Sequence, residues 1–119
     1  AVTRADRAGR LAQFARNFDF FGAPAALFFY IDRDMQQGQW ADLGMFMQSI
    51  MLLARERGLH TCAQEAWSVW YKTLGAFFDV PPELMLFAGM SIGHLDDSQP
   101  INTLRTRRAA LDEFATFVG

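Results

Sequence analysis

Cysteine and histidine are scarce in this sequence. It has one cysteine, Cys62, and two histidines, His60 and His94, among 119 residues. A single thiol excludes a disulfide within the chain and any zinc site built from several thiolates. Spacing alone assembles no catalytic triad and no metal site, so we expect neither. So little cysteine also favours the reducing cytoplasm as the location of the protein.

Lysine and long apolar runs are scarce as well. Of the 11 basic residues only Lys72 is a lysine, and the formal net charge is -2. Without a basic excess, binding to nucleic acid or to an anionic membrane is not expected. The longest apolar stretches, 23–31 and 84–92, fall well short of the roughly 20 residues that span a bilayer. We therefore expect a soluble protein with no signal peptide.

Apolar residues as a class are abundant. They make up 51% of the chain, with twelve Phe, six Met and three Trp. The length fits one globular domain, and this apolar load is more than a core of that size requires. Part of it is expected to face a partner or a cofactor.

The periodicity of the apolar residues predicts alternating helices and strands. We expect strands buried on both faces at 25–31 and 84–92, and a strand or turn at 59–63. Helices are expected at 4–18, 40–57, 65–78 and 109–117. Two long strands make a poor sheet unless another segment or another chain completes it. The pattern favours an α+β or α/β layered fold.

The expected helix 40–57 is apolar nearly all round. Its residues 43–54 include few polar side chains, and Gly58 is a typical helix terminator. A helix without a polar face must be covered by protein over most of its circumference. We expect it to be the central helix.

Three arginines, Arg105, Arg107 and Arg108, lie within four residues near the end of the sequence. Guanidinium groups so close together repel one another unless anions shield them. A bound phosphate is one such anion, because arginine binds phosphate through two parallel hydrogen bonds. The alternative is a solvated loop that forms salt bridges to its acidic neighbours, namely Asp96, Asp97, Asp112 or Glu113.

Several phrases, in order, resemble the nitroreductase superfamily, particularly its FMN-dependent, nitrobenzoate-reductase-like members. They are NFDFFGAP at 17–24, GQWADLG at 38–44, ARERGLHTCAQEAW at 54–67, GMSIG at 89–93, and PIN at 100–102 followed by the arginines. The resemblance extends over essentially the whole chain. It implies an α+β fold, a nitroreductase-like α/β sandwich with a mixed sheet flanked by helices.

The resemblance also implies a function and a site. Members of the superfamily form homodimers through the long central helix and bind FMN at the dimer interface. They transfer electrons from NAD(P)H to nitroaromatic or related acceptors by a ping-pong mechanism. The matching cofactor-binding residues are Ala63, Gln64, Glu65 and Ala66, which pass the flavin ring, and Arg105 and Arg108, which hold its phosphate. The backbone amide of Glu65 approaches the flavin N5, and no side chain acts as a nucleophile. Arg107 matches no family role.

One family feature has no counterpart here. Members begin with a helix that carries an Arg-Ser-x-Arg phrase, so we expect residues 1–119 to be the C-terminal portion of a single nitroreductase-like domain whose N-terminal part is absent. Two alternatives stay open. The chain is a truncated, non-catalytic dimeric fragment, or it is a helical partner-binding module with an arginine-rich tail for anions and no flavin.

Overall fold

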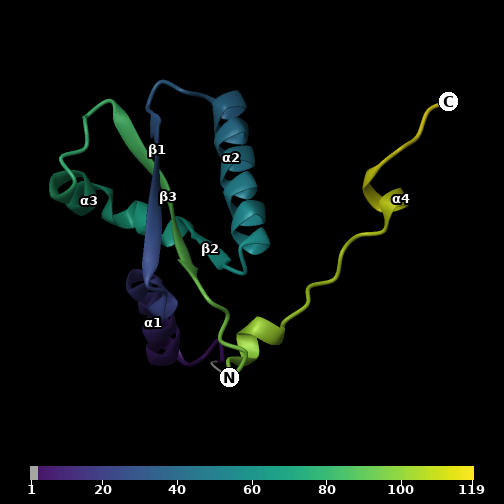
Figure 1. Ribbon diagram of the computed structural model, residues 1–119, viewed down its shortest axis with the longest axis horizontal. Helices are drawn as coiled ribbons and strands as arrows, with labels where there is room; N and C mark the ends of the chain where they lie inside the picture. The colour runs from purple at the N-terminus through teal and green to yellow at the C-terminus, as the bar shows by residue number, and fades with distance from the viewer. Residues whose placement is uncertain (1–2) are drawn as a thin grey trace.

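The computed structural model describes residues 3–119. The chain forms three strands and several helices, followed by an extended arm (Figure 1). The helices are α1 Arg7–Ala15, α2 Gln37–Glu56, α3 Tyr71–Phe77 and α4 Leu111–Phe114, with 3₁₀ segments η1 Arg16–Gly22, η2 Glu65–Trp70 and η3 Pro100–Thr103. The strands are β1 Ala25–Asp32, β2 His60–Gln64 and β3 Leu84–Gly93. Among the described residues, no helix is long and apolar enough to cross a membrane.

The three strands form one sheet in the order β1-β3-β2. Both pairs are antiparallel, with Phe28 opposite Gly89 and Ala63 opposite Met90. Strands β1 and β3 confirm the positions predicted at 25–31 and 84–92; β3 is largely buried as expected, whereas Phe29 is the one buried residue of β1. The segment that sequence left as a strand or a turn is strand β2. The α+β class is confirmed, and the described strands include no parallel pair, which a mixed sheet would add.

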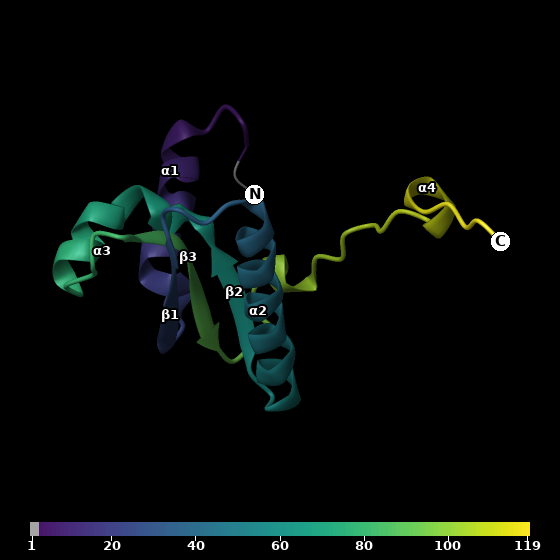
Figure 2. The same cartoon turned by 90° about the horizontal axis from the view of Figure 1, so that it is seen from above.

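The core lies between this sheet and α2, which covers one face (Figure 2). Phe29 and Met90 from the sheet pack with Met47 of α2, and Met90 has no exposed surface. The opposite face is covered by aromatic side chains, in which Trp67 contacts Phe28 with ring centroids 5.1 Å apart. The sheet is therefore the middle layer of a three-layer arrangement.

The predicted continuous helix over 65–78 is wrong in its first half. The segment is a 3₁₀ turn up to Trp70, whose backbone (φ -103°, ψ 20°) leaves the helical region before α3 begins. The long-range packing of Trp67 against β3 decides this conformation, whereas apolar periodicity reports only which residues face inwards.

Other helix boundaries also differ from the predictions. Helix α1 begins at Arg7, because the Asp6 carboxylate accepts a hydrogen bond of 2.8 Å from the Gly9 amide and caps the helix. It ends at Ala15, where η1 replaces the remainder of the predicted helix 4–18. Helix α2 starts three residues before the predicted Trp40, and of the predicted helix 109–117 only α4 is helical.

Helix α2 is covered on one side only. Met47 and Ala54 are buried against the sheet, whereas Met45 is 62% and Leu52 61% exposed. Met45 and Leu52 are seven residues apart and lie on the helix face opposite the buried pair. This chain therefore covers the side of α2 that faces the sheet and leaves the opposite apolar side exposed.

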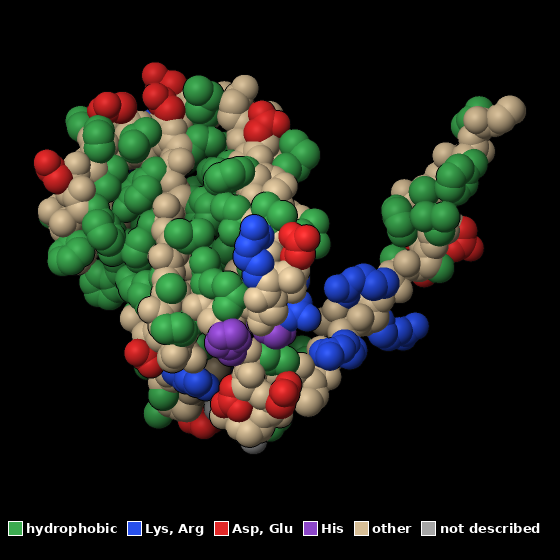
Figure 3. Space-filling model, viewed as in Figure 1, with side chains coloured by type: hydrophobic (Ala, Val, Ile, Leu, Met, Phe, Trp, Pro, Cys, Tyr) green, Lys and Arg blue, Asp and Glu red, His purple; other side chains and the backbone are tan. Residues whose placement is uncertain are grey.

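The arm, residues 104–119, extends away from the body of the molecule (Figures 1 and 3). It ends in apolar side chains with little cover, including Phe114, Phe117 and Val118, which are 69%, 79% and 95% exposed. The radius of gyration is 17.3 Å, whereas about 13–14 Å is usual for a compact chain of this length. The arm accounts for the excess.

Candidate functional site

The segment Ala63 to Ala66 lies where β2, an edge strand, passes into η2. Ala63 and Glu65 are exposed, and Gln64 between them is buried. An edge strand leaves every second set of backbone N–H and C=O groups free on its outer side. This segment can therefore offer backbone hydrogen bonds and a flat, small-residue surface to a planar ligand.

Gln64 is buried at 2% exposure and reaches across to η1. Its Nε2 donates to the backbone oxygen of Asn17 at 2.8 Å. Its Oε1 is buried and has no hydrogen-bond partner among the described residues. The side chain of Gln64 thus points inwards, away from the exposed surface of Ala63 and Glu65.

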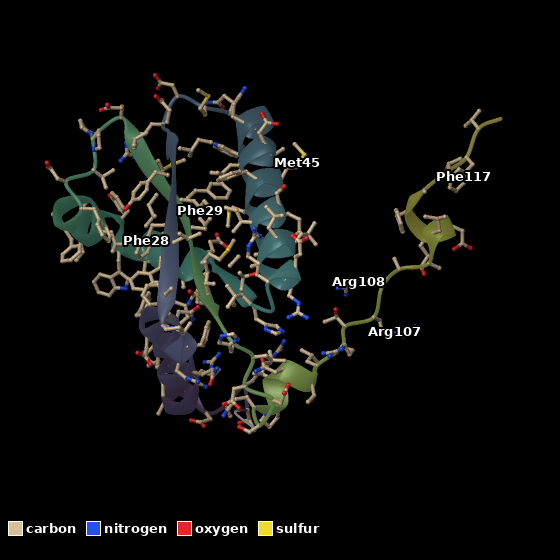
Figure 4. All side chains as sticks on the ribbon, viewed as in Figure 1. Phe28, Phe29, Met45, Arg107, Arg108 and Phe117 are labelled. Carbon is tan, nitrogen blue, oxygen red and sulfur yellow. The ribbon has the colours of Figure 1, made fainter. Side chains whose placement is uncertain are left out.

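A layer of aromatic rings lies beneath the same segment. The Trp67 ring stacks on Phe20 with centroids 4.8 Å apart and meets Phe18 edge to face at 5.2 Å. An apolar pocket of about 270 Å³ opens beside it, lined by Phe18, Trp67, Trp70, Thr73 and Leu74. Phe28, labelled in Figure 4, meets both Phe20 and Trp67 edge to face, with ring centroids 5.9 Å and 5.1 Å apart. The layer makes the inner side of the segment apolar.

The η1 segment has an unusual backbone. Phe20 and Phe21 have positive φ angles of 47° and 56°, followed by Gly22 at 82°. A bulky residue in this region costs about 1–3 kcal/mol and persists only where surrounding contacts hold it. Sequence reasoning missed this turn, although Gly22 directly after two phenylalanines was a signal for it.

Gly89 allows Trp67 to approach the sheet. A Cβ placed on Gly89 would lie 2.5 Å from Trp67 Cδ1. We expect Gly89→Ala to displace the indole and to lower the free energy of unfolding by about 1–3 kcal/mol. Urea unfolding followed by tryptophan fluorescence measures the loss.

Gly75→Ala is the matched control for that substitution. Gly75 lies in α3, and a Cβ there meets no atom within 4 Å. Since glycine inside a helix is less favourable than alanine, this variant should be more stable by about 0.5–1 kcal/mol. Equal stability of Gly89→Ala and the wild type would contradict the close contact with Trp67.

The two predicted phosphate-binding arginines lie on the arm and are exposed. Arg105 Nη1 donates to the backbone oxygens of Asn102 at 3.1 Å and Leu104 at 3.0 Å. Arg108 donates to Thr106, to both its backbone and its hydroxyl oxygen. Neither guanidinium forms an ion pair, since Arg57 with Glu56 is the only pair within 4.0 Å among residues 3–119. The arginines are thus solvated, as in the alternative reading, but the salt bridges of that reading are not formed among the described residues.

The carboxylate of Asp96 organises the turn that precedes the arm. It accepts hydrogen bonds from the Ser98 hydroxyl at 2.6 Å and the Gln99 amide at 3.1 Å. The bond from the Ser98 hydroxyl, followed by those from the Gln99 side chain and the Ser98 backbone, holds the pKa of Asp96 below its ordinary range. The backbone oxygen of Asp96 also accepts from Asn102 at 2.8 Å, so the turn sets the direction in which the arm leaves.

A depressed pKa predicts how this turn responds to acid. Its stabilisation is present above the unfolded-state pKa of Asp96 and is lost as the pH falls through the lower folded-state value. We expect the Ser98 amide proton, followed by NMR, to titrate with a midpoint below that of an ordinary aspartate. Asp96→Asn should abolish the transition, and a midpoint in the ordinary range would contradict the hydrogen bonds.

The histidines and the cysteine do not form a site of their own. His60 Nε2 contacts Arg55 Nη1 at the end of α2, and its Nδ1 is buried without a partner among the described residues. His94 is exposed, and residues 3–119 include no group of three or more potential metal ligands. Desolvation raises the pKa of the Cys62 thiol above its ordinary value.

The predicted site residues fall into two groups. Ala63, Gln64, Glu65 and Ala66 lie together at the end of β2, whereas Arg105 and Arg108 lie on the arm. Figure 4 shows Arg108 on the extended part of the arm, outside the body. No hydrogen bond joins the two groups in the described residues. Their assignment to a cofactor stays a prediction.

Comparison with known proteins identifies the family of the chain. The model of the Nitroreductase family matches residues 1–94. The chain is 41% identical over 115 residues to the chloronitrobenzene nitroreductase of Comamonas testosteroni, which is 97% of this chain and 51% of that protein. It is 37% identical over 118 residues to the 4-nitrobenzoate reductase of Pseudomonas putida, or 99% of this chain and 52% of the relative.

A solved structure gives the same result. The FMN and NADPH-dependent nitroreductase NfnB from sphigopyxis sp. strain HMH superimposes with a TM-score of 0.93 at 43% identity, covering 99% of this chain and 53% of that one. The chain thus spans about half the length of the relatives that it matches. The family match over most of the sequence, the relatives and the shared fold agree, and the chain belongs to the nitroreductase family.

Proposed function

We propose that the protein to which this chain belongs is an FMN-dependent oxidoreductase that transfers electrons from NAD(P)H to nitroaromatic or related acceptors. The support is membership of the family together with the named activities of the relatives, which reduce nitrobenzoate or chloronitrobenzene. The solved relative is described as dependent on FMN and NADPH.

The residues present fit FMN. The exposed edge at Ala63 and Glu65 offers backbone groups and little side-chain bulk, which suits a flat ring system. The guanidinium groups of Arg105 and Arg108 have no carboxylate partner within 4.0 Å among residues 3–119, and a phosphate suits the paired hydrogen bonds that a guanidinium donates. The single observation that carries the proposal is the match of residues 1–94 to the nitroreductase family, whose relatives are named nitro-reducing enzymes.

Each group of residues has a separate task. When bound, FMN supplies the hydride acceptor and donor that the protein itself lacks. The Glu65 backbone N–H would donate a hydrogen bond to the bound flavin ring, and such a donor stabilises negative charge on the ring. Arg105 and Arg108 bind the phosphate and so fix the position of the ring. The aromatic layer around Trp67 keeps the inner side of the segment apolar.

We further propose that the protein works as a homodimer. The outer face of α2 carries two apolar pairs at a spacing of seven residues, Met45 with Leu52 and Phe46 with Leu53, all more than half exposed. This spacing suits packing against a second helix of the same kind. The arm, with its uncovered Phe114 and Phe117, supplies a second apolar surface for the other copy. Figure 3 shows the apolar side chains gathered on the body and along the arm.

The ping-pong order follows if NAD(P)H and the acceptor occupy one site in turn. With NADPH varied at several fixed 4-nitrobenzoate concentrations, double-reciprocal plots of the initial rates should be parallel. Intersecting lines would contradict the order. A dimer that binds no flavin would contradict the proposed function and favour the non-catalytic fragment.

We also propose that the protein works in the cytoplasm, because a single cysteine suits a reducing compartment.

A further inference from the structure

The Gln64 side chain is a buried polar contact beside the segment assigned to the flavin. It is 2% exposed, and its Nε2 donates to the Asn17 backbone oxygen at 2.8 Å and lies 3.4 Å from Asn17 Oδ1. A carbonyl oxygen accepts only from a donor, so this contact fixes which end of the amide faces η1. Gln64 therefore ties the end of β2 to a segment 47 residues away.

The same side chain carries an unfavourable feature. Its Oε1 is buried with no partner among residues 3–119. Leaving a buried acceptor without a donor destabilises a protein, and a methionine of similar length would avoid the loss. The Gln64 side chain is nevertheless buried, with the bond from its nitrogen to Asn17 formed and its oxygen without a partner.

A second tether lies on the other side of Glu65 and Ala66. Trp67 packs closely over Gly89 and stacks on Phe20 at 4.8 Å, with 26° between the ring planes. Phe20, like Asn17, belongs to η1. The two-residue segment Glu65–Ala66 is thus held at both ends by one turn, and this is the turn with the strained backbone.

We propose that Gln64 is a positioning residue, whose amide holds η1 so that the Glu65 backbone N–H points at the flavin. This inference rests on the proposed function. A donor fixed in direction before the reaction stabilises the reduced flavin more than a mobile one does, because no reorganisation is needed. Loss of the tether therefore lowers the flavin reduction potential and weakens FMN binding.

Two substitutions test the tether in the FMN-loaded protein. Gln64→Met keeps the length of the side chain and removes the donor, and we expect the FMN Kd to rise by about tenfold, the lower end of the effect of losing an outer-shell contact at a metal site, with a lower midpoint potential. Gln64→Glu cannot donate when ionised, whereas its protonated form can. Burial raises the pKa of such a carboxyl, so lowering the pH should return the potential of this variant towards that of the wild type.

The control and the contrary results are specific. Gln13→Met, on the exposed side of α1, should leave the Kd, the potential and their pH dependence unchanged. A purely structural role of Gln64 would lower the Tm of both variants while their potentials stay parallel to that of the wild type at every pH. That result, or an unchanged Kd and potential in Gln64→Met, would overturn the proposal.

A measurement without FMN separates this inference from the proposed function. Wild-type protein that fails to bind FMN contradicts the function. In the apo protein, hydrogen exchange still reports the tether: amides of 65–67 should exchange faster in Gln64→Met than in the wild type or in Gln13→Met. Equal exchange in all three proteins means that Gln64 positions nothing.

Discussion

Replacing Arg105 and Arg108 together by alanine is expected to weaken FMN binding by about 100- to 10,000-fold, because each hydrogen bond between charged groups contributes about 1.5–3 kcal/mol. Both guanidinium groups are exposed and have no carboxylate partner in the described chain. The loss should therefore appear in the Kd, measured by quenching of flavin fluorescence, while the Tm of the apo protein stays the same.

Two controls make this result specific. Arg107→Ala removes the same charge from the same arm, at a position with no assigned role, and should change the Kd by much less. Riboflavin lacks the phosphate, so its affinity should be equal in the wild type and in the double variant. An equal loss of affinity for riboflavin and FMN would show that the arginines do not bind the phosphate.

Placing glutamates at Met45 and Leu52 is expected to convert the homodimer into a monomer. Both side chains are more than 60% exposed in the single chain, on the face of α2 that turns away from the sheet. Burying two unpaired carboxylates in an apolar interface costs several kcal/mol. We expect the dimer dissociation constant to rise by about 1000-fold or more.

Mass measurement by light scattering after gel filtration follows this change. Leu11→Glu is the matched control, since Leu11 is 59% exposed on α1, away from the proposed interface, and should leave the mass unchanged. The double variant should also lose FMN if the interface helps to hold it. If the double variant keeps the mass of a dimer, the interface does not include this face of α2.

The sequence predicted the secondary structure best where burial decides it. Continuous apolar runs identified β1 and β3, because strands covered on both faces have no polar alternation to obscure them. The apolar circumference of α2 was also read correctly, although only half of it is covered by this chain. Periodicity failed at η1 and η2, where the contact of Trp67 with Gly89 and the positive φ of Phe20 set the backbone.

The candidate site was only partly accessible from the sequence. Family phrases located Ala63–Ala66 and the arginines, and the structure adds how the first group is held. The contact from Gln64 to Asn17 joins residues 47 positions apart, and no local pattern encodes such a pairing. The burial of Gln64 does not follow from strand alternation, since Cys62, two residues earlier, is exposed, and the partner that Gln64 meets depends on the turn at Phe20.

The most direct test of the account is an anaerobic visible spectrum of the purified protein with FMN, followed by NADPH and then 4-nitrobenzoate. The account predicts that one flavin per chain is retained after gel filtration, that NADPH bleaches its absorbance, and that the nitro compound restores it. Protein that elutes as a folded dimer without flavin, or retains flavin that NADPH does not bleach, would contradict the assignment as a nitro-reducing flavoenzyme.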